Sequence, residues 1–331
     1  MAVGKIMASK IQSVLSEAER TQSLATYDTE AMRNRFTKLV KSGELVSPLR
    51  KLDARVEYWE SLDPHDRMLH KMRGLSALDS GVVFGGFSAA LAHGLRVPFH
   101  LLDRPVVTTT AQSNTGSTQR LCRIVVEDDA STMAAGFRVT SFERTLFDCL
   151  RRVAFKDGLV IADSALAMMG NNRDALIELM QRFHGRWGSG RVESILAHAD
   201  GRSESGLESL ARAFLIEHGY LLPDLQVVIP NLFGSGMNYR VDFCWGSPQE
   251  GFVVGECDGK IKYQDPVMTE GRDAVDVMMD ERQREAELTA TGARVMRISH
   301  RDVVDPERME RKLAMYGIPK VQSSWLEGSG R

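Results

Sequence analysis

The spacing of hydrophobic residues predicts helices near the start of the chain and strands between helices near its end. From residue 8 to residue 18, apolar side chains recur at the spacing of one helical face, at Ile11, Val14, Leu15 and Ala18. A second helix is expected to begin after Asp28, a good N-cap residue, and to end at Gly43, which suits the left-handed position after a helix. Residues 44–50 predict a short strand.

The second expected helix is amphipathic and basic. Its apolar side is formed by Met32, Phe36, Leu39 and Val40. Four basic side chains spread over the remainder: Arg33, Arg35, Lys38 and Lys41. A helix, a basic helix and a strand in this order are typical of a winged helix-turn-helix, in which a helix fits the major groove and cations neutralise phosphates. We therefore predict that these four residues contact DNA; the alternative is an ordinary solvated helix surface.

The middle of the chain predicts a mixed α and β region. Residues 104–110 and 121–126 are β-rich runs, and the polar segment between them predicts a hairpin connection or a flexible tip. Helices are expected after Ser141, which can cap one of them, and through residues 159–198. The small, polar segment 199–206 predicts a domain boundary. The domains expected from these signals are 1–60, 61–200 and 201–318, with a tail at 319–331.

The last third predicts a helix, three strands, a helix and a strand. The expected helices cover residues 203–218 and 276–291, the second ended by Gly292. The expected strands cover residues 224–229, 239–245, 252–259 and 293–298. This order matches an α/β domain with a mixed sheet.

Carboxylates recur on the predicted sheet. Strand alternation places Glu256 and Asp258 on one face, and Asp242 on a neighbouring strand brings a third acid close to them. Glu208 lies at the edge of the buried stripe of its helix, where it reaches water or a polar pocket. Like charges at short range take up a proton or bind a cation. Oxygen ligands suit Mg²⁺ or Mn²⁺, which could polarise a phosphodiester, so we predict a metal-dependent nuclease site.

Basic side chains near these acids leave two further alternatives open. Arg284 is placed to reach a phosphate or one of the acids, or to pair with Asp280 one turn earlier. A structural interpretation is that the acids only form ion pairs, with Arg240, Arg284 and Lys260. In that case Mg²⁺ would leave the melting temperature unchanged.

Length and composition set the limits of these interpretations. At roughly 150 residues per domain, the 331 residues indicate two domains or three small ones. The sequence has no apolar run of about 18 residues and no apolar leader core, so we expect a cytoplasmic protein without a membrane partner. Its 4 cysteines are widely spaced, which predicts neither disulfides nor a zinc knuckle. The formal charge of −2 excludes a uniformly basic surface but allows a local basic face.

Residues 203–304 resemble the PD-(D/E)xK endonuclease superfamily, in particular its very-short-patch-repair-like branch. The matching positions are Glu208, Gln226, the run 240–243, the run 254–259, Arg284 and the run 292–297. The resemblance implies that Asp242, Glu256 and the carbonyl of Cys257 bind the metal and that Glu208 is a supporting acid. Asp258 stands where the superfamily has its lysine, the histidine that commonly follows is absent, and Lys260, Lys262 and Tyr263 are nearby. The candidate catalytic set is Glu208, Asp242, Glu256, Asp258, Lys260 and Arg284.

Residues 5–165 resemble the AbiEi-like antitoxin family of type IV toxin–antitoxin systems. The resemblance rests on the runs 58–67, 83–95 and 139–148. It implies a winged helix that binds operator DNA, and a cognate toxin or defence-system protein as a further partner. The Gly-x-Tyr that usually ends the wing is replaced here by residues 54–58, so the helix is expected to contribute more contacts than the wing.

Together these features predict an α/β multidomain protein. Its expected parts are an N-terminal winged helix-turn-helix, an α+β middle domain and a C-terminal restriction-endonuclease-like mixed sheet flanked by helices. The expected function is a DNA-binding protein with an Mg²⁺-dependent endonuclease-like domain, active in phage defence or DNA repair. The alternative is a non-catalytic, antitoxin-like transcriptional regulator with a degenerate nuclease domain.

Overall fold

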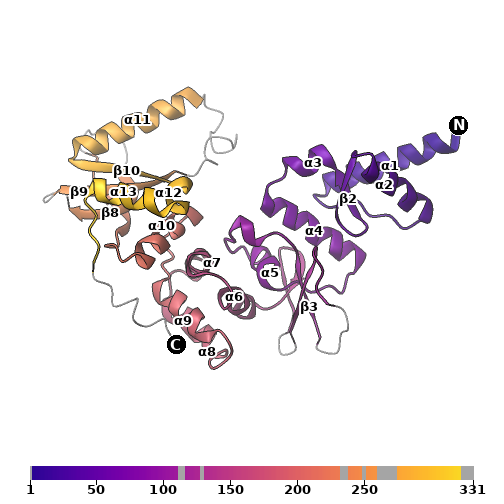
Figure 1. Cartoon of the computed structure of the whole chain (residues 1–331), viewed down its shortest axis with the longest axis horizontal. Helices are drawn as coiled ribbons and strands as arrows, with labels where there is room; N and C mark the ends of the chain where they lie inside the picture. The colour runs from indigo at the N-terminus through magenta and orange to yellow at the C-terminus, as the bar shows by residue number, and fades with distance from the viewer. Residues whose placement is uncertain are drawn as a thin grey trace. The chain divides into compact units, whose positions relative to one another are not determined.

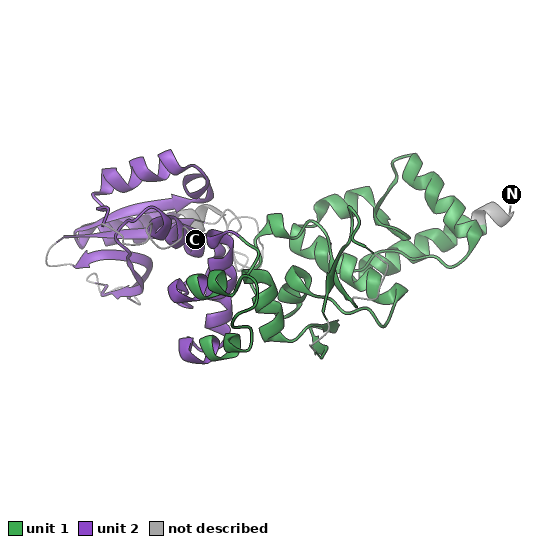
Figure 2. Cartoon of the chain, turned by 60° about the horizontal axis from the view of Figure 1, so that its bottom comes forward, with its two compact units in different colours: residues 1–153, 177–194 green, residues 154–176, 195–331 purple. Residues whose placement is uncertain are grey.

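The computed structural model describes residues 2–110, 116–126, 130–231, 238–247, 251–258 and 274–321. The chain divides into two compact units (Figure 2): residues 1–153 with 177–194, and residues 154–176 with 195–331. Both units contain helices and strands, so the expectation of a multidomain protein of mixed α and β structure is confirmed at this level.

The first unit begins with two helices, α1 (Ala2–Arg20) and α2 (Glu30–Lys41). Their apolar faces form one core with the following strand: Ile11, Leu15, Met32, Phe36 and Leu45 are buried together. The predicted cap was wrong by one residue, because the Oγ1 of Thr29, and not the Asp28 side chain, accepts the N–H of Met32. Gly43 has a φ of 80°, as expected for a residue that ends a helix.

A two-stranded antiparallel hairpin follows α2 (Figure 1). It consists of β1 (Leu45–Leu49) and β2 (Leu52–Arg55), and Ala25 forms an isolated bridge to the other edge of β2, at Asp53. Lys51 sits at the tip of the hairpin with a φ of 64°. The strand expected at residues 44–50 is thus present and paired.

The remainder of the first unit contains short helices and small sheets. The helices are α3 (Val56–Ser61), α4 (Pro64–Leu78), α5 (Gly86–Ala92), a 3₁₀ turn (Phe99–Leu101) and α6 (Phe142–Leu150). The strands are β3 (Val106–Thr109), β4 (Cys122–Val125), β5 (Thr132–Ala134) and β6 (Phe137–Val139). The Ser141 hydroxyl caps α6 by accepting from Arg144, as predicted.

The pairing of β3 with β4 corrects one expectation. The two strands are parallel, with Val106 opposite Cys122, so the chain between them is not a hairpin connection. The reason is that a hairpin reverses the chain at once, whereas here the connection returns to the start of β3 before pairing. Part of the predicted tip, residues 111–115, lies outside the described residues.

The second unit is organised around a four-stranded sheet with the order β10-β9-β8-β7. These strands are β7 (Asp224–Ile229), β8 (Tyr239–Ser247), β9 (Gly251–Asp258) and β10 (Ala293–Ser299). The first three are antiparallel neighbours, and β10 runs parallel to β9 after the crossover helix α11 (Ala274–Ala290). The expected mixed sheet is therefore present.

Helices cover both faces of this sheet (Figure 1). On one face, α10 (Gly206–Glu217) and α13 (Pro306–Tyr316) bury Phe214 and Leu313 against Phe243. On the other face, Leu288 of α11 packs with residues of β8, β9 and β10. The second unit also contains α7 (Phe155–Met168) and α12 (His300–Val304). The helices α8 (Arg173–Gln181) and α9 (Ser189–His198) each have residues in both units.

Candidate functional site

The four basic residues predicted to contact DNA all lie on the exposed side of α2. Arg33, Arg35, Lys38 and Lys41 are exposed. Met32 and Phe36 are buried on the opposite side, so the helix presents its cations outward while its apolar stripe holds it on the unit. Arg33 is 3.4 Å from Glu30, and both side chains are more than half exposed, so this pair does little to neutralise the surface.

The hairpin extends this basic surface. Arg50 and Lys51 occupy the turn between β1 and β2, and both are exposed. Glu44, at the start of the hairpin, accepts a hydrogen bond from Ser42 instead of pairing with a cation of the helix. The surface of α2 and the hairpin tip is hereafter called the α2–hairpin surface.

Glu208 is buried among polar groups of the second unit. The hydroxyl of Ser205 caps α10 by accepting a hydrogen bond from the main-chain N–H of Glu208. Glu208 itself is only 5% exposed. The Glu208 Oε2 accepts from Gln226 Nε2 at 3.0 Å and from the Glu204 N–H at 2.8 Å. Burial raises the pKa of Glu208, and the nearby charge of Asp242 raises it further. Of the two positions left open for Glu208, burial beside polar groups is the one observed.

Gln226, which holds Glu208, has an unusual backbone for a strand residue. Its φ is 54°, in the left-handed region, although its neighbours pair regularly with β8. Such a conformation costs about 1–3 kcal/mol outside glycine and is typical of functional sites. It places an amide donor beside a buried carboxylate.

The Asp242 side chain forms a hydrogen bond to β9 just beyond the end of the β8–β9 pairing. The described pairing of these strands ends with Phe243 opposite Gly255. One step further, the Asp242 Oδ2 accepts the main-chain N–H of Cys257 at 2.8 Å. A carboxylate therefore takes the place of a main-chain acceptor, which holds Asp242 next to Glu256 and Cys257.

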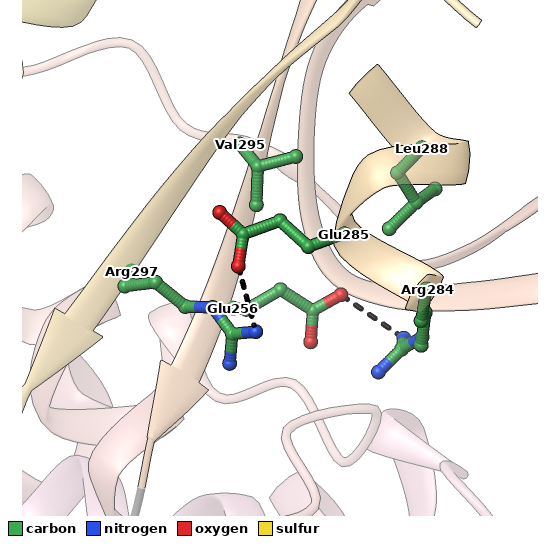
Figure 3. A pocket seen from close by; sticks show the side chains of 6 residues that line it. All are labelled: Glu256, Arg284, Glu285, Leu288, Val295 and Arg297. Atoms are coloured by element: carbon green, nitrogen blue, oxygen red, sulfur yellow. Dashed lines mark hydrogen bonds and ion pairs between the residues drawn. The ribbon is translucent and has the colours of Figure 1, made fainter. Parts of the chain in front are cut away.

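Two arginines contact the acids of β9. Arg284 of α11 donates to the Glu256 Oε1 at 3.0 Å and to the carbonyl of Arg240 at 2.6 Å. Arg297 of β10 donates to the Asp258 Oδ1 at 2.8 Å and to the Glu285 Oε2 at 3.2 Å. Figure 3 shows the resulting pocket, lined by Glu256, Arg284, Glu285, Leu288, Val295 and Arg297. Of the roles left open for Arg284, contact with an acid is the one observed.

Cys257 of β9 is buried in the apolar core between the sheet and the helices α10 and α13. Burial raises the pKa of Cys257, and the charges of Asp242, Glu208, Glu256 and Asp258, in that order, add to the shift. Carboxylates from α10, β8 and β9 therefore lie close enough to Cys257 to act on its charge, and their convergence on one metal ion stays a prediction. Each of them also has a protein donor: an amide for Glu208 and Asp242, and a guanidinium for Glu256 and Asp258. Within the described residues, no group of three or more His, Cys, Asp or Glu is arranged to hold a metal ion.

Some predicted residues take other positions or cannot be placed. Arg240 pairs with Glu204 and not with a site acid. Lys260 lies outside the described residues, as do Lys262, Tyr263 and the side chain of Asp280.

Arg297 is the site residue that the sequence interpretation missed. A signal for it exists in the expected topology: a strand that runs parallel to β9 places Arg297 opposite Glu256 and on the same face. That signal depends on the register between β9 and β10, in which Asp258 and Arg297 are 39 residues apart along the chain. The hydrophobic pattern does not specify this register.

Comparison with known proteins gives two curated relatives. The chain is 32% identical over 186 residues to "Uncharacterized protein MT2308" of Mycobacterium tuberculosis strain CDC 1551 and to "Uncharacterized protein Rv2248" of strain H37Rv. The matched region covers 52% of this chain and 63% of each relative, so the chain spans less than two thirds of their length. No protein-family model and no solved structure matches the chain. None of the described helices has both the length and the apolar character needed to cross a membrane.

Proposed function

We propose that this chain is a DNA-binding protein that contacts duplex DNA through the α2–hairpin surface. The observation that supports the proposal most directly is the exposure of Arg33, Arg35, Lys38 and Lys41 on one helix, followed at once by a hairpin with Arg50 and Lys51 at its tip. An α-helix fits into the major groove of duplex DNA, and a basic hairpin beside it reaches the adjacent phosphate backbone of the DNA. The winged-helix interpretation of the N-terminal part rests on this arrangement.

The test is duplex binding measured by fluorescence anisotropy on DNA from upstream of the protein's own gene. The double variant Arg35→Ala/Lys38→Ala is compared with Arg301→Ala, which removes an exposed cation from α12. Each lost phosphate contact lowers the slope of log K against log salt by about 1, so the double variant should lose about 2. No binding by the unmodified chain, or equal binding by the double variant and the control, would contradict the proposal.

A second function, phosphodiester hydrolysis with Mg²⁺ or Mn²⁺, is favoured by the acids of the neighbouring strands β8 and β9. Asp242 and Glu256 lie on these two strands, and Asp242 bonds to the main chain of Cys257, so carboxylate and carbonyl oxygens of the kind that Mg²⁺ prefers are near one another. The helix, three antiparallel strands, crossover helix and parallel strand supply the element order of the endonuclease-like domain that the sequence resembles. When bound, the ion would supply positive charge to polarise the phosphodiester.

The hydrogen bonds of Glu208, Asp242 and Glu256 indicate what each residue would have to do in that reaction. Arg284 must release Glu256, or share it, before Glu256 can serve as a ligand. Gln226 and the Glu204 N–H keep Glu208 in place beside Asp242. The Cys257 N–H orients Asp242, so a bound ion would meet an acid that is already positioned.

Cleavage of supercoiled plasmid and of single-stranded DNA tests the second function. Asp242→Ala and Glu256→Ala should abolish cleavage, whereas Asp224→Ala, which removes an exposed acid of β7, should not. The same ions should raise the melting temperature of the unmodified chain by mass action. If duplex DNA binds but neither cleavage nor a melting shift occurs, the chain is a non-catalytic regulator with a degenerate nuclease-like domain.

A further inference from the structure

A stack of rings and guanidinium groups lies in the first unit and shares no residue with either site described above. Phe147 of α6 and Phe183 are buried and stacked, with ring centroids 4.4 Å apart and planes at 8°. The guanidinium of Arg151 lies 5.1 Å from the centroid of Phe147 and 5.9 Å from that of Trp187. Arg182 and Arg186 lie 5.1 and 5.7 Å from the Phe183 centroid. Rings held in this way orient the planar guanidinium groups.

Trp187 ends this stack at the protein surface. It is 71% exposed, although tryptophan usually buries most of its ring. The loop around it has a defined shape: Gly188 has a φ of 86°, and a Cβ there would lie 2.7 Å from the Cβ of Arg151. Because the backbone of Gly188 packs tightly on Arg151, the turn next to the Trp187 indole has a fixed conformation.

The surroundings of Trp187 carry excess positive charge. Residues 143–153 and 178–193 contain six arginines and four carboxylates, an excess of two in a chain whose formal charge is −2. Asp148 is buried, where it binds Arg144 and Arg151, and Glu143 pairs with Arg182. Glu193 contacts His184. Arg152, Arg186 and Arg191 are exposed beside the indole loop.

We propose that this surface, the Trp187 patch (Arg151, Arg152, Arg182, Arg186, Trp187 and Arg191), binds single-stranded nucleic acid. An exposed indole offers a face on which an unpaired base can stack, and such stacking tolerates every base. The arginines around it match the phosphates of the same strand. Duplex DNA fits less well, because its bases already stack on one another and leave no face for Trp187.

The test is binding of a fluorescently labelled oligothymidine to the full chain, measured by anisotropy. Trp187→Ala should weaken binding about tenfold, within the range known for loss of one stacked base, and Trp187→Phe should retain most of it. Arg186→Glu should weaken binding at low salt by more than at high salt. The matched control is Met315→Ala, which removes another exposed apolar side chain, 73% exposed and on α13. Since Trp187 is exposed, its variants should melt as the unmodified chain does.

The two proposed nucleic-acid surfaces are separable in the same assay. Arg35→Ala/Lys38→Ala should reduce duplex binding and leave oligothymidine binding unchanged, and Trp187→Ala should do the reverse. Oligothymidine binding that is unaffected by Trp187→Ala would overturn the inference. So would absence of oligothymidine binding together with binding to phosphatidylserine vesicles, which would make the patch a membrane-surface contact.

Discussion

Asp258 of β9 and Arg297 of β10 form an ion pair between two parallel strands, with 2.8 Å between Oδ1 and Nη1. The sequence of residues 203–304 resembles a superfamily that has a lysine at the position of Asp258. The cation next to Asp258 comes from the neighbouring strand, so the pair compensates the charge of this carboxylate.

Removal of Arg297 should change the response to metal more than the stability. Both partners are about one third exposed, at 35% and 37%, so Arg297→Ala should cost no more than about 1 kcal/mol of unfolding free energy. Asp258 and Glu285 would lose their shared cation, so Mg²⁺ should raise the melting temperature further than in the unmodified chain. Differential scanning fluorimetry with and without Mg²⁺ measures both effects, with Arg301→Ala as the control. An unchanged Mg²⁺ response would contradict this prediction.

Arg212 and Asp163 form a buried pair that joins α10 to α7. Their atoms are 2.8 Å apart, and the side chains are 8% and 0% exposed. Burial raises the pKa of Asp163 even though the guanidinium opposes the shift. Arg212→Met should destabilise the fold by about 3–5 kcal/mol, because it leaves a buried carboxylate without its cation.

The double variant Arg212→Met/Asp163→Leu distinguishes the loss of the ion pair from the cost of leaving one charge buried without a partner. It should recover most of the loss, since two apolar side chains of similar size need no partner. Urea unfolding of the single and double variants measures the coupling. A loss below about 1 kcal/mol in Arg212→Met would show that water or another donor already serves Asp163.

Asp302 should give the second unit a pH-dependent stability. Its carboxylate is 1% exposed and accepts from Ser299, Arg308 and Lys312. Burial opposes ionisation, but these hydrogen bonds hold the pKa of Asp302 well below its usual 3.8. Because the folded pKa is below the unfolded one, the stabilisation is complete above pH 3.8 and is lost as the pH falls through the folded value.

Asp302→Asn tests this dependence. It should cost about 2 kcal/mol at pH 7, as expected for hydrogen bonds to a charged group, and progressively less as the pH is lowered below about 4. Denaturant unfolding at pH 7 and at pH 3 measures the difference. Glu307→Gln, which removes an exposed charge from α13, should have little effect at either pH.

The four cysteines should differ in reactivity. Burial raises the pKa of Cys149, Cys244 and Cys257, whereas Cys122 is only partly buried. Reaction depends on the thiolate, so a native chain should react quickly with dithionitrobenzoate at one thiol and at all four after denaturation. Cys122→Ser should abolish the fast phase and Cys149→Ser should leave it. Rapid labelling of Cys257 would show that the apolar core around β9 opens in solution.

The hydrophobic pattern predicted the elements of the second unit because each strand and helix there has one buried face. Val254 and Glu256 share a face as the alternation requires, and α11 ends at Gly292, whose φ is 90°. Asp242 and Glu256 lie on adjacent strands, as the expected sheet requires. Local chemistry was less decisive where two neighbouring residues can both cap a helix, as with Asp28 and Thr29 at the start of α2.

The hydrophobic pattern did not predict the direction or the register of strand pairing. The parallel pairing of β3 with β4, and the alignment of Arg297 with Glu256, depend on how a distant segment returns to a strand. The same holds for the partners of the acids: Arg284 and Arg297 lie 28 and 39 residues from the carboxylates they contact.

The order of amino acids established the amphipathic basic helix, the mixed sheet and the acids on it, because these depend on periodicity within one element. Long-range packing settled which donors those acids meet, and it assembled the stack beneath Trp187 from α6 and the segment after α8. Periodicity fixes the direction of a side chain relative to its own element, whereas a contact also needs the position of a second element that only folding supplies.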